Sequence, residues 1–584
     1  MMWAGVAMAV LLAGPCVAQA QKKQTKAPAV KKAAPMPASP WAPVHKGPTP
    51  PKLVVLIVVD QFRADYVEKF HTQWSGGLKQ MVDEGAWFRN AAYPYAATET
   101  CVGHSTVSTG ALPATHGMVA NTWWDRGQGA AVTCTADANA KNIGYAGGKA
   151  TGGDSAWRME VPSFAEELRF QRGGGAKVAT FSLKARAAIA LAGHKADAVT
   201  WFNEGSGTWE TSNKYGSVAF VEEYVKAHPV SEDYGKIWVP MLPPSVYVYS
   251  GQTPGAGAPE GWSMSLPHAL KGKSGATGPD KAFYREWETS PYADAYLDKL
   301  AERAVDAMGL GQHGGTDFLG VSFSTLDYAG HSFGPRSHEV QDVLARLDHT
   351  LAAMFDHLDR RIGHGNYVVV VTGDHGVAPL PEDMQKMGSE AGWMKLADIQ
   401  QGIEKALEPL NYPKPAVAVV AGSDIYFAPG VWEKLKGDAA GMRAVVEAIE
   451  KVPGVASVHT AEEIKGRAAT DDPMVQALGE SYFEGRSGDL FVVPKAYWPM
   501  DFSAAGTTRP YGTTHGTPYA YDQRVPILMM GAGIHGGVYW TAATPADIAP
   551  TLAALCGITL STREGHVLEE ALAGPGAGHK AGTR

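Results

Sequence analysis

Aspartate and histidine side chains follow three apolar runs of the sequence, each at the point where the run ends. Asp60 closes LIVVD, Asp327 and His331 follow GVSFS four residues apart, and Asp374 and His375 follow YVVVVTG. Carboxylate oxygens and imidazole nitrogens together form a donor set that zinc accepts, and manganese or iron less commonly. One aspartate after a strand is ordinarily a turn or helix-cap residue, but three such sets in one chain favour a metal cluster.

A hydroxyl-rich segment and one further histidine could complete such a site. The segment AATETCVGHSTVSTG contains Thr98, Thr100 and Ser105, and a hydroxyl becomes a good nucleophile when a base or a metal lowers its pKa. A helix beginning near Val102 would place its N-terminus, which favours anions, above Thr100. His515 lies in the Gly/Thr-rich YGTTHGTPYAYDQRVPIL, just before another apolar run. Taken alone, the segment reads as a polar loop and the histidine as a surface residue, so both gain meaning only beside the metal cluster.

The elements that must position these residues are buried strands separated by helices. Non-alternating apolar runs predict strands covered on both faces, and periodic segments between them predict helices. The predicted strands are Leu53–Val59, Val178–Ser182, Phe318–Phe323, Tyr367–Val371 and Val525–Met530, and the helices include Tyr296–Met308 and Val340–Leu358. This order predicts an α/β fold with a mostly parallel central sheet and helices on both faces. Because ligands bind outside the carboxyl ends of such strands, the three sets can converge there.

Several regions depart from this rhythm. Residues 195–295 are rich in Gly, Pro, Trp and Tyr and predict an irregular cap. Residues 385–485 predict a small α+β insertion, with helices at 394–407 and 441–451 and strands at 416–420, 424–427 and 456–460. Residues 21–51 hold eight Pro and no periodic apolar face, which indicates a linker. The catalytic domain is therefore expected over 52–568, followed by a flexible tail at 569–584.

Composition and the N-terminal residues bound the class of protein. A chain of 584 residues with 45% apolar side chains can bury a large core, and a net charge of −8 argues against a general nucleic-acid binder. Residues 1–20 read as a signal peptide, because an uncharged apolar stretch precedes Ala18-Gln19-Ala20. A lipoprotein anchor at Cys16 is the alternative. Since no later run is long enough for a membrane helix, we expect a periplasmic or secreted protein without a membrane span.

Three cysteines remain after removal of the signal, so at most one disulfide can form within the chain. Cys556 lies in the apolar helical pattern TLAALCG, which suggests core. Cys101–Cys134 is therefore the expected pair if a disulfide forms.

Eight motifs, in this order, resemble the alkaline phosphatase superfamily. The similarity is to its type I phosphodiesterase/nucleotide pyrophosphatase branch, and within it to zinc-dependent periplasmic alkaline phosphatases with a threonine nucleophile. It runs from about Leu53 to Leu568. The motifs are TETCVGHSTVSTG, THGMVANTWWD, FSLKARAAI, LDYAGHSFGP, VVVTGDHG, GRSGDLFVVPK, THGTPYAYDQRVPI and TPADIAPTLAALCGI.

The resemblance implies a nucleophile and two Zn²⁺ ions per chain. Thr100 would attack phosphorus and form a phosphothreonine. One zinc would be bound by Asp60, Asp374, His375 and the Thr100 oxygen, and the other by Asp327, His331 and His515. The first metal would make Thr100 an alkoxide, and the second would stabilise the leaving alcohol. His104 and His116, which lie near Thr100 in the sequence, are interpreted as structural hydrogen-bonding residues.

Three further residues decide the substrate class. By resemblance, Asn121 donates a hydrogen bond to a phosphoryl oxygen, and Lys184 and Arg186 match the Lys-x-Arg pair of the monoesterase members. A phosphate monoester is a dianion and needs such cations, and residues two apart on a strand-like stretch point the same way.

The sequence therefore predicts a monomeric alkaline phosphatase that acts on small phosphate monoesters and meets nucleotides only as substrates. A phosphodiesterase or nucleotide pyrophosphatase is the enzymatic alternative. A non-catalytic phospholigand-binding or structural protein that retained the fold is the alternative from another class.

Overall fold

The computed structural model describes residues 49–251, 253–465, 470–504, 507 and 509–573. The signal peptide expected at 1–20, nearly all of the linker expected at 21–51 and the end of the expected tail lie outside these residues. Within the described part of the chain, none of the helices is long and apolar enough to cross a membrane.

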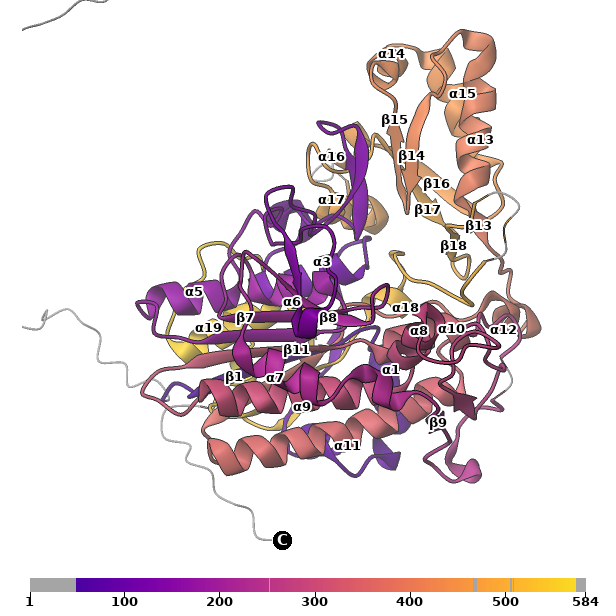
Figure 1. The fold of residues 1–584 in the computed structure, drawn as a ribbon. Coiled ribbons are helices and arrows are strands. Elements are labelled where there is room, and N and C mark those ends of the chain that lie inside the picture. Colours follow the sequence, from indigo (N-terminus) through magenta and orange to yellow (C-terminus); the bar gives the residue numbers. More distant parts are fainter. Residues whose placement is uncertain (1–48, 252, 466–469, 505–506, 508, 574–584) are drawn as a thin grey trace, which may run out of the picture. The chain divides into compact units, whose positions relative to one another are not determined.

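A ten-stranded sheet forms the centre of the fold (Figure 1). Its five middle strands, β12 to β7 in the order below, are parallel to one another, and antiparallel neighbours flank them. The mostly parallel central sheet predicted from the sequence is thereby confirmed. In order across the sheet the strands are β20 (Gly537–Ala543), β2 (Ala86–Ala91), β19 (Ile527–Gly531), β12 (Tyr367–Thr372), β1 (Leu53–Val59), β11 (Asp317–Phe323), β6 (Val178–Ser182), β7 (Ala198–Asn203), β8 (Thr208–Ser212) and β5 (Asn142–Gly144).

Strand β1 shows why the apolar runs do not alternate. Its odd-numbered residues pack into one helix layer and its even-numbered residues into the other, so every side chain is buried. Helices therefore cover both faces of the sheet, as Figure 1 shows. The odd-numbered side meets α2 (Gly77–Glu84), α7 (Ala219–Ala227), α9 (Pro291–Met308) and α11 (His338–Arg361). The even-numbered side meets α3 (Thr100–Thr109), α5 (Phe164–Gln171), α6 (Ala185–Ala192) and α19 (Ile548–Cys556).

Two strands lie where the sequence suggested only irregular structure. Residues 198–203 and 208–212 form β7 and β8 of the central sheet. Their sequences, AVTWFN and TWETS, are rich in β-branched and aromatic residues, which favour strands, but they are too short to show a clear period. Beyond α7 the elements are short and sparse until α8 (Lys281–Thr289), with β9 (Ile237–Trp238) pairing with β10 (His268–Ala269).

A separate four-stranded antiparallel sheet carries its own hydrophobic core. Its strands are β14 (Val417–Ala421), β15 (Asp424–Phe427), β17 (Leu490–Pro494) and β16 (Val455–Thr460), and its helices are α13 (Leu396–Leu407), α14 (Val431–Lys436) and α15 (Ala439–Glu450). Helices and strands predicted between 394 and 460 are present at these positions.

Several shorter elements border the central sheet's carboxyl edge and the cavities described below. They are α1 (Ala64–Phe70), α4 (Pro113–His116), β3 (Thr122–Asp125), β4 (Ala130–Thr133), α10 (Thr325–Phe333), α12 (Pro381–Lys386) and α18 (Ala520–Gln523).

Candidate metal centre

The carboxyl ends of three adjacent parallel strands bring the predicted metal ligands together. Asp60 follows β1, α10 with Asp327 and His331 follows β11, and Asp374 and His375 follow β12. His515 joins them from the loop before α18. The donor atoms form two groups, each with ligand atoms within 4.8 Å of one another: cluster 1, which is Asp60, Asp374 and His375, and cluster 2, which is Asp327, His331 and His515.

All three histidines present the same ring nitrogen to the clusters. The Nδ1 atom lies 2.8 Å from the carbonyl oxygen of Thr513 in His331, 2.9 Å from that of Gly376 in His375, and 2.7 Å from that of Thr98 in His515. Because a carbonyl oxygen only accepts, Nδ1 carries the proton and Nε2 keeps its lone pair. The hydrogen bond at Nδ1 fixes the tautomer and the ring orientation that a metal ligand needs.

Cluster 1 contains two buried carboxylate oxygens that accept no hydrogen bond within the described residues. Nδ1 of His104 lies 3.2 Å from one of them, Oδ2 of Asp374, but donates to the carbonyl oxygen of Thr100. Within the described residues, neither Oδ1 of Asp60 nor Oδ2 of Asp374 accepts a hydrogen bond, although both are buried. They lie 3.5 Å and 3.4 Å from Nε2 of His375. Buried acceptors left in this way are costly, and a metal cation is the group that would satisfy all three.

The balance of charge within clusters 1 and 2 also indicates that they would hold cations. Lys184 is the one lysine or arginine in the described part of the chain that forms an ion pair with any of their three carboxylates, and it pairs with two of them, its Nζ lying 2.6 Å from Asp60 Oδ2 and 2.5 Å from Asp327 Oδ2. Burial, together with the nearby Asp327 and Asp374, raises the pKa of Asp60 well above its usual value. An uncompensated buried carboxylate is strongly destabilising, so the residues present fit divalent cations.

The two clusters lie side by side. The ring of His375 in cluster 1 is 3.5 Å, centroid to centroid, from the ring of His515 in cluster 2. Burial, and the proximity of His375 and His331, lower the pKa of His515 well below its usual value, which keeps the imidazole neutral. Neutral imidazole is the form that binds metals.

Thr100 is the first residue of α3, and its hydroxyl points toward cluster 1. Its Oγ1 lies 3.5 Å from Nε2 of His375. The helix begins two residues before Val102, the position considered from the sequence, so its positive end lies at Thr100 itself. A hydroxyl beside a metal-type cluster and at a helix N-terminus is placed to attack an anionic group.

Gly103 lets α3 pack directly against the residue that carries cluster 1. A Cβ at this position would lie 2.1 Å from the carbonyl oxygen of Asp374 and 2.7 Å from its Cβ. Only a hydrogen fits there, so the glycine sets the distance between Thr100 and the cluster.

Gly103→Ala is therefore expected to displace Thr100 from cluster 1 and to lower kcat/KM for the reaction at this site roughly 10²-fold. A displacement of about 1 Å between reacting groups has an effect of that size. Steady-state kinetics together with the metal content of the purified variant would measure this. Gly314→Ala is the matched control, since nothing lies within 4 Å of a Cβ added there. Wild-type kinetics in Gly103→Ala would contradict this view of α3.

A disulfide and two hydrogen bonds tie Asn121 to the start of α3. The N–H of Cys101 donates to Oδ1 of Asn121 at 2.9 Å, and the N–H of Asn121 donates to Oε2 of Glu99 at 2.6 Å. Cys101 is bonded to Cys134, the expected pair, and Cys556 is a buried free thiol. Glu99 was not singled out by the sequence, because its role depends on the fold of the hairpin that follows Asn121.

Lys184 and Arg186 do not lie on a strand-like stretch, which corrects the expectation from the sequence. Lys184 is the N-cap of α6 and Arg186 the second residue of that helix, because the Ala-rich ARAAIALA favours a helix. Both nevertheless line one cavity of about 960 Å³, the Lys184 cavity, together with Asp327 and His331. Nε of Arg186 is buried and has no hydrogen-bond partner among the described residues.

Gln61 joins the two clusters and escaped the sequence analysis. Its N–H donates to Oδ1 of Asp374 at 3.0 Å, and its Nε2 donates to Oδ1 of Asp327 at 2.6 Å. Its backbone adopts a φ of 69°, a strained conformation for a residue other than glycine. A glutamine after Asp60 carries no sequence signal of this role.

His104 and His116 are hydrogen-bonding residues inside the fold, as expected. His104 places Nδ1 2.8 Å from the carbonyl oxygen of Thr100 and Nε2 2.8 Å from the hydroxyl of Ser322. His116 places Nε2 3.1 Å from the hydroxyl of Thr106.

The sequence and the fold of this chain are similar to those of known proteins. Residues 54–518 match the family described as type I phosphodiesterase / nucleotide pyrophosphatase. The chain is 30% identical over 519 residues to alkaline phosphatase PafA of Elizabethkingia meningoseptica, covering 87% of this chain and 92% of the relative. It is 31% identical over 535 residues to alkaline phosphatase PhoK of a Sphingomonas species, covering 87% and 88%. The crystal structure of PafA is similar with a TM-score of 0.79 at 28% identity, over 90% of this chain and 99% of that chain.

Proposed function

This chain belongs to the type I phosphodiesterase / nucleotide pyrophosphatase family and is a hydrolase related to alkaline phosphatases, and from this premise we propose that it cleaves phosphate monoesters at clusters 1 and 2. The observation that carries the proposal is the convergence of two metal-type clusters beside the Thr100 hydroxyl.

Zinc is the proposed metal, since mixed carboxylate and imidazole donors suit it. Asp60, Asp374 and His375, with the Thr100 oxygen, would hold one ion, and Asp327, His331 and His515 the other. When bound, two such cations would supply Lewis-acid stabilisation to the charge that develops on the phosphoryl group and its leaving oxygen. Gln61 keeps a carboxylate of each cluster in place through the hydrogen bonds described above.

The chain's own residues carry out a two-step transfer. The Thr100 oxygen forms a bond to phosphorus while the ester P–O bond breaks, giving a phosphothreonine and the free alcohol. A water then cleaves the phosphothreonine, so inorganic phosphate leaves and Thr100 is restored. One water is consumed: the leaving alcohol takes the hydroxyl proton of Thr100, and of the two water hydrogens one restores the Thr100 hydroxyl and the other stays on the phosphate. The N-terminus of α3 favours negative charge at this position.

Lys184, Arg186 and Asn121 are the proposed phosphate-binding residues, and they favour a monoester. A monoester is a dianion with three non-bridging oxygens, whereas a diester carries one charge less and a second substituent. The buried Nε of Arg186, without a partner among the described residues, is a donor that such an oxygen would satisfy. Lys184 and Arg186 line the same cavity, so both cations can act on one bound group.

An extracytoplasmic location is part of the proposal. Disulfides persist mainly in oxidising compartments, and the Cys101–Cys134 bond supports that environment. The export signal expected at residues 1–20 stays a prediction of the sequence.

Metal content and activity together test the proposal. We expect purified protein to hold two zinc equivalents per chain and to lose at least roughly 10²-fold of its phosphomonoesterase rate on chelation, because both charged oxygens lose their stabilisation. Zinc should restore the rate. His515→Ala is expected to lower the metal content toward one equivalent. Protein that remains fully active when shown by mass spectrometry to be free of metal would exclude this mechanism.

A further inference from the structure

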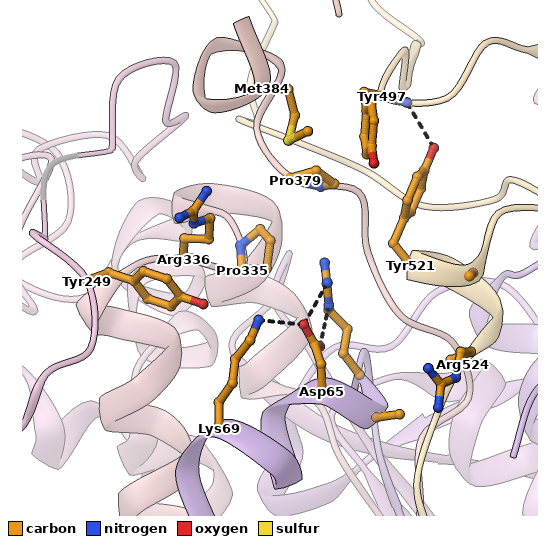
Figure 2. Close-up of a pocket in the computed structure, with 13 residues that line it drawn as sticks. Asp65, Lys69, Tyr249, Pro335, Arg336, Pro379, Met384, Tyr497, Tyr521 and Arg524 are labelled. Carbon is orange, nitrogen blue, oxygen red and sulfur yellow. Dashed lines mark hydrogen bonds and ion pairs between the residues drawn. The ribbon is translucent and has the colours of Figure 1, made fainter. Parts of the chain in front are cut away.

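A second cavity, the Arg336 pocket, lies outside the proposed reaction site. Its volume is about 590 Å³, and none of its lining residues lines the Lys184 cavity. Figure 2 shows its walls, which come from α1, the turn between α10 and α11, the loop that follows cluster 1, and α18.

The lining of the Arg336 pocket is strongly cationic. Four of its residues carry a positive charge, Arg63, Lys69, Arg336 and Arg524, and Asp65 is the single carboxylate among the lining residues. The excess is three positive charges, in a protein whose formal net charge is −8. A concave surface lined by one sign of charge concentrates ions of the opposite sign.

Asp65 offsets only part of this charge. It accepts hydrogen bonds from Nε of Arg63 at 2.9 Å and from Nζ of Lys69 at 2.6 Å, so one carboxylate serves two cations. Arg63 is also fixed by donating Nη1–H to the carbonyl oxygen of Val377 at 2.7 Å. Figure 2 shows Lys69 and Asp65 meeting in this way.

The other two arginines have no ion-pair partner. In the described residues no carboxylate lies within ion-pair distance of Arg336 or Arg524. Arg336 donates from Nη1 to the sulfur of Met387 at 3.1 Å, and Arg524 donates from Nη2 to the carbonyl oxygen of Arg89 at 2.9 Å. Most of the N–H groups of both guanidinium forks are therefore available, and this planar fork matches the oxygens of phosphate.

Two carboxylates outside the pocket interact with arginines of its lining. Asp383 interacts electrostatically with Arg336, and Asp522 with Arg63, but neither lines the cavity. Asp522 is buried and accepts from the N–H of Thr517 at 2.9 Å. The cationic character of the lining is thus reduced but not cancelled.

Tyrosines form two preformed walls of the pocket. On one side the ring of Tyr249 has Lys69 Nζ at 5.9 Å and Arg336 Cζ at 5.0 Å from its centroid. On the other side Tyr497 and Tyr521 stack at 5.7 Å, and the N–H of Tyr497 donates to the Tyr521 hydroxyl at 3.2 Å. The φ of Tyr497 is 65°, a conformation that persists only when its surroundings hold it.

We propose that the Arg336 pocket binds a phosphate-type oxyanion with two or more negative charges. The net positive charge of the lining, together with the two arginine forks that have no ion-pair partner among the described residues, selects this chemistry over a neutral or cationic ligand. The volume lies within the range of small-molecule sites, so the oxyanion is either free inorganic phosphate or the phosphoryl group of a small ester. The proposal depends neither on Thr100 nor on clusters 1 and 2.

Isothermal titration calorimetry of the zinc-loaded protein tests the site with two probes, inorganic phosphate and the non-hydrolysable phenylphosphonate. We expect two binding events per chain. Arg336→Ala with Arg524→Ala should abolish one event and leave p-nitrophenyl phosphate turnover unchanged, whereas Arg186→Ala should weaken the other. The probe that binds more tightly to the Arg336 pocket identifies free phosphate or an ester as the occupant.

Control variants distinguish binding at the Arg336 pocket from effects of overall charge and of altered folding. Lys226→Ala with Arg303→Ala removes two exposed cations elsewhere and should keep both events. If the double variant Arg336→Ala with Arg524→Ala has a lowered melting temperature, the two single variants are measured instead. Each should weaken binding at the Arg336 pocket about tenfold, as expected for loss of a charged hydrogen-bonding group. Binding of both probes that is unchanged in the pocket variants would overturn the proposal, whether the wild-type protein shows one event or two.

Discussion

Replacing Thr100 by alanine is expected to lower kcat/KM for a phosphate monoester by roughly 10³-fold or more, which corresponds to about 4 kcal/mol of transition-state stabilisation. The reason is that, among the described residues, only the Thr100 hydroxyl forms a hydrogen bond with a side chain of cluster 1. Without it no phosphoenzyme can form, and water must attack the ester directly. Steady-state kinetic assays of the zinc-loaded variant would measure the loss of kcat/KM.

Two variants make the result specific to the hydroxyl. Thr100→Ser keeps the oxygen at the N-terminus of α3 and should retain most of the activity, whereas Thr100→Val keeps the shape and should behave like the alanine variant. Metal content must be measured in each, because Thr100 is also a proposed ligand of one ion. An alanine variant with more than about a tenth of the wild-type rate would show that Thr100 is not the nucleophile.

Removing the charges of Lys184 and Arg186 together is expected to lower kcat/KM for a monoester by roughly 10²- to 10⁴-fold, since each hydrogen bond to a charged group contributes about 1.5–3 kcal/mol. A diester carries one charge less at the same position, so its rate should fall by a smaller factor than the monoester rate, although the loss of Lys184 from both clusters lowers it as well. Parallel assays with p-nitrophenyl phosphate and bis-p-nitrophenyl phosphate compare the two losses. Equal losses on both substrates would contradict the assignment of these residues.

The single variant Arg186→Ala gives the cleaner comparison. Lys184 also contacts Asp60 and Asp327, so its removal disturbs both clusters as well as the substrate. Arg186 has no such ion pair within the described residues. Lys273→Ala is a matched control, because Lys273 lines the same cavity but its side chain is 62% exposed, where a lost charge has little effect.

The core of the fold could be predicted because it depends on local pattern. The apolar run Leu53–Val59 has no polar residue, which only a strand buried on both faces tolerates, and β1 is such a strand. Strands β7 and β8 could not be found in this way. They are short, and their burial depends on neighbours brought in from elsewhere in the sheet, so tertiary context decided their state.

The metal ligands could be predicted for a different reason. Asp60, Asp327 and Asp374 each follow a parallel strand, and neighbouring parallel strands present their carboxyl ends at one edge. Gln61 and Glu99 could not be predicted, because their contacts with Asp374 and Asn121 join parts of the chain that no sequence spacing relates. The spacing of Lys184 and Arg186 fits a strand or a helix start equally well, because two residues cannot distinguish the two periods.

The ratio of monoester to diester turnover tests the central claim most directly. Zinc-loaded wild-type protein would be assayed with p-nitrophenyl phosphate and bis-p-nitrophenyl phosphate under the same conditions, with Thr100→Ala as the blank for contaminating activity. The proposed site predicts a kcat/KM for the monoester at least roughly 10²-fold above that for the diester, since two cations are placed for the dianion. A higher value for the diester would contradict the assignment of the substrate and would instead indicate a phosphodiesterase.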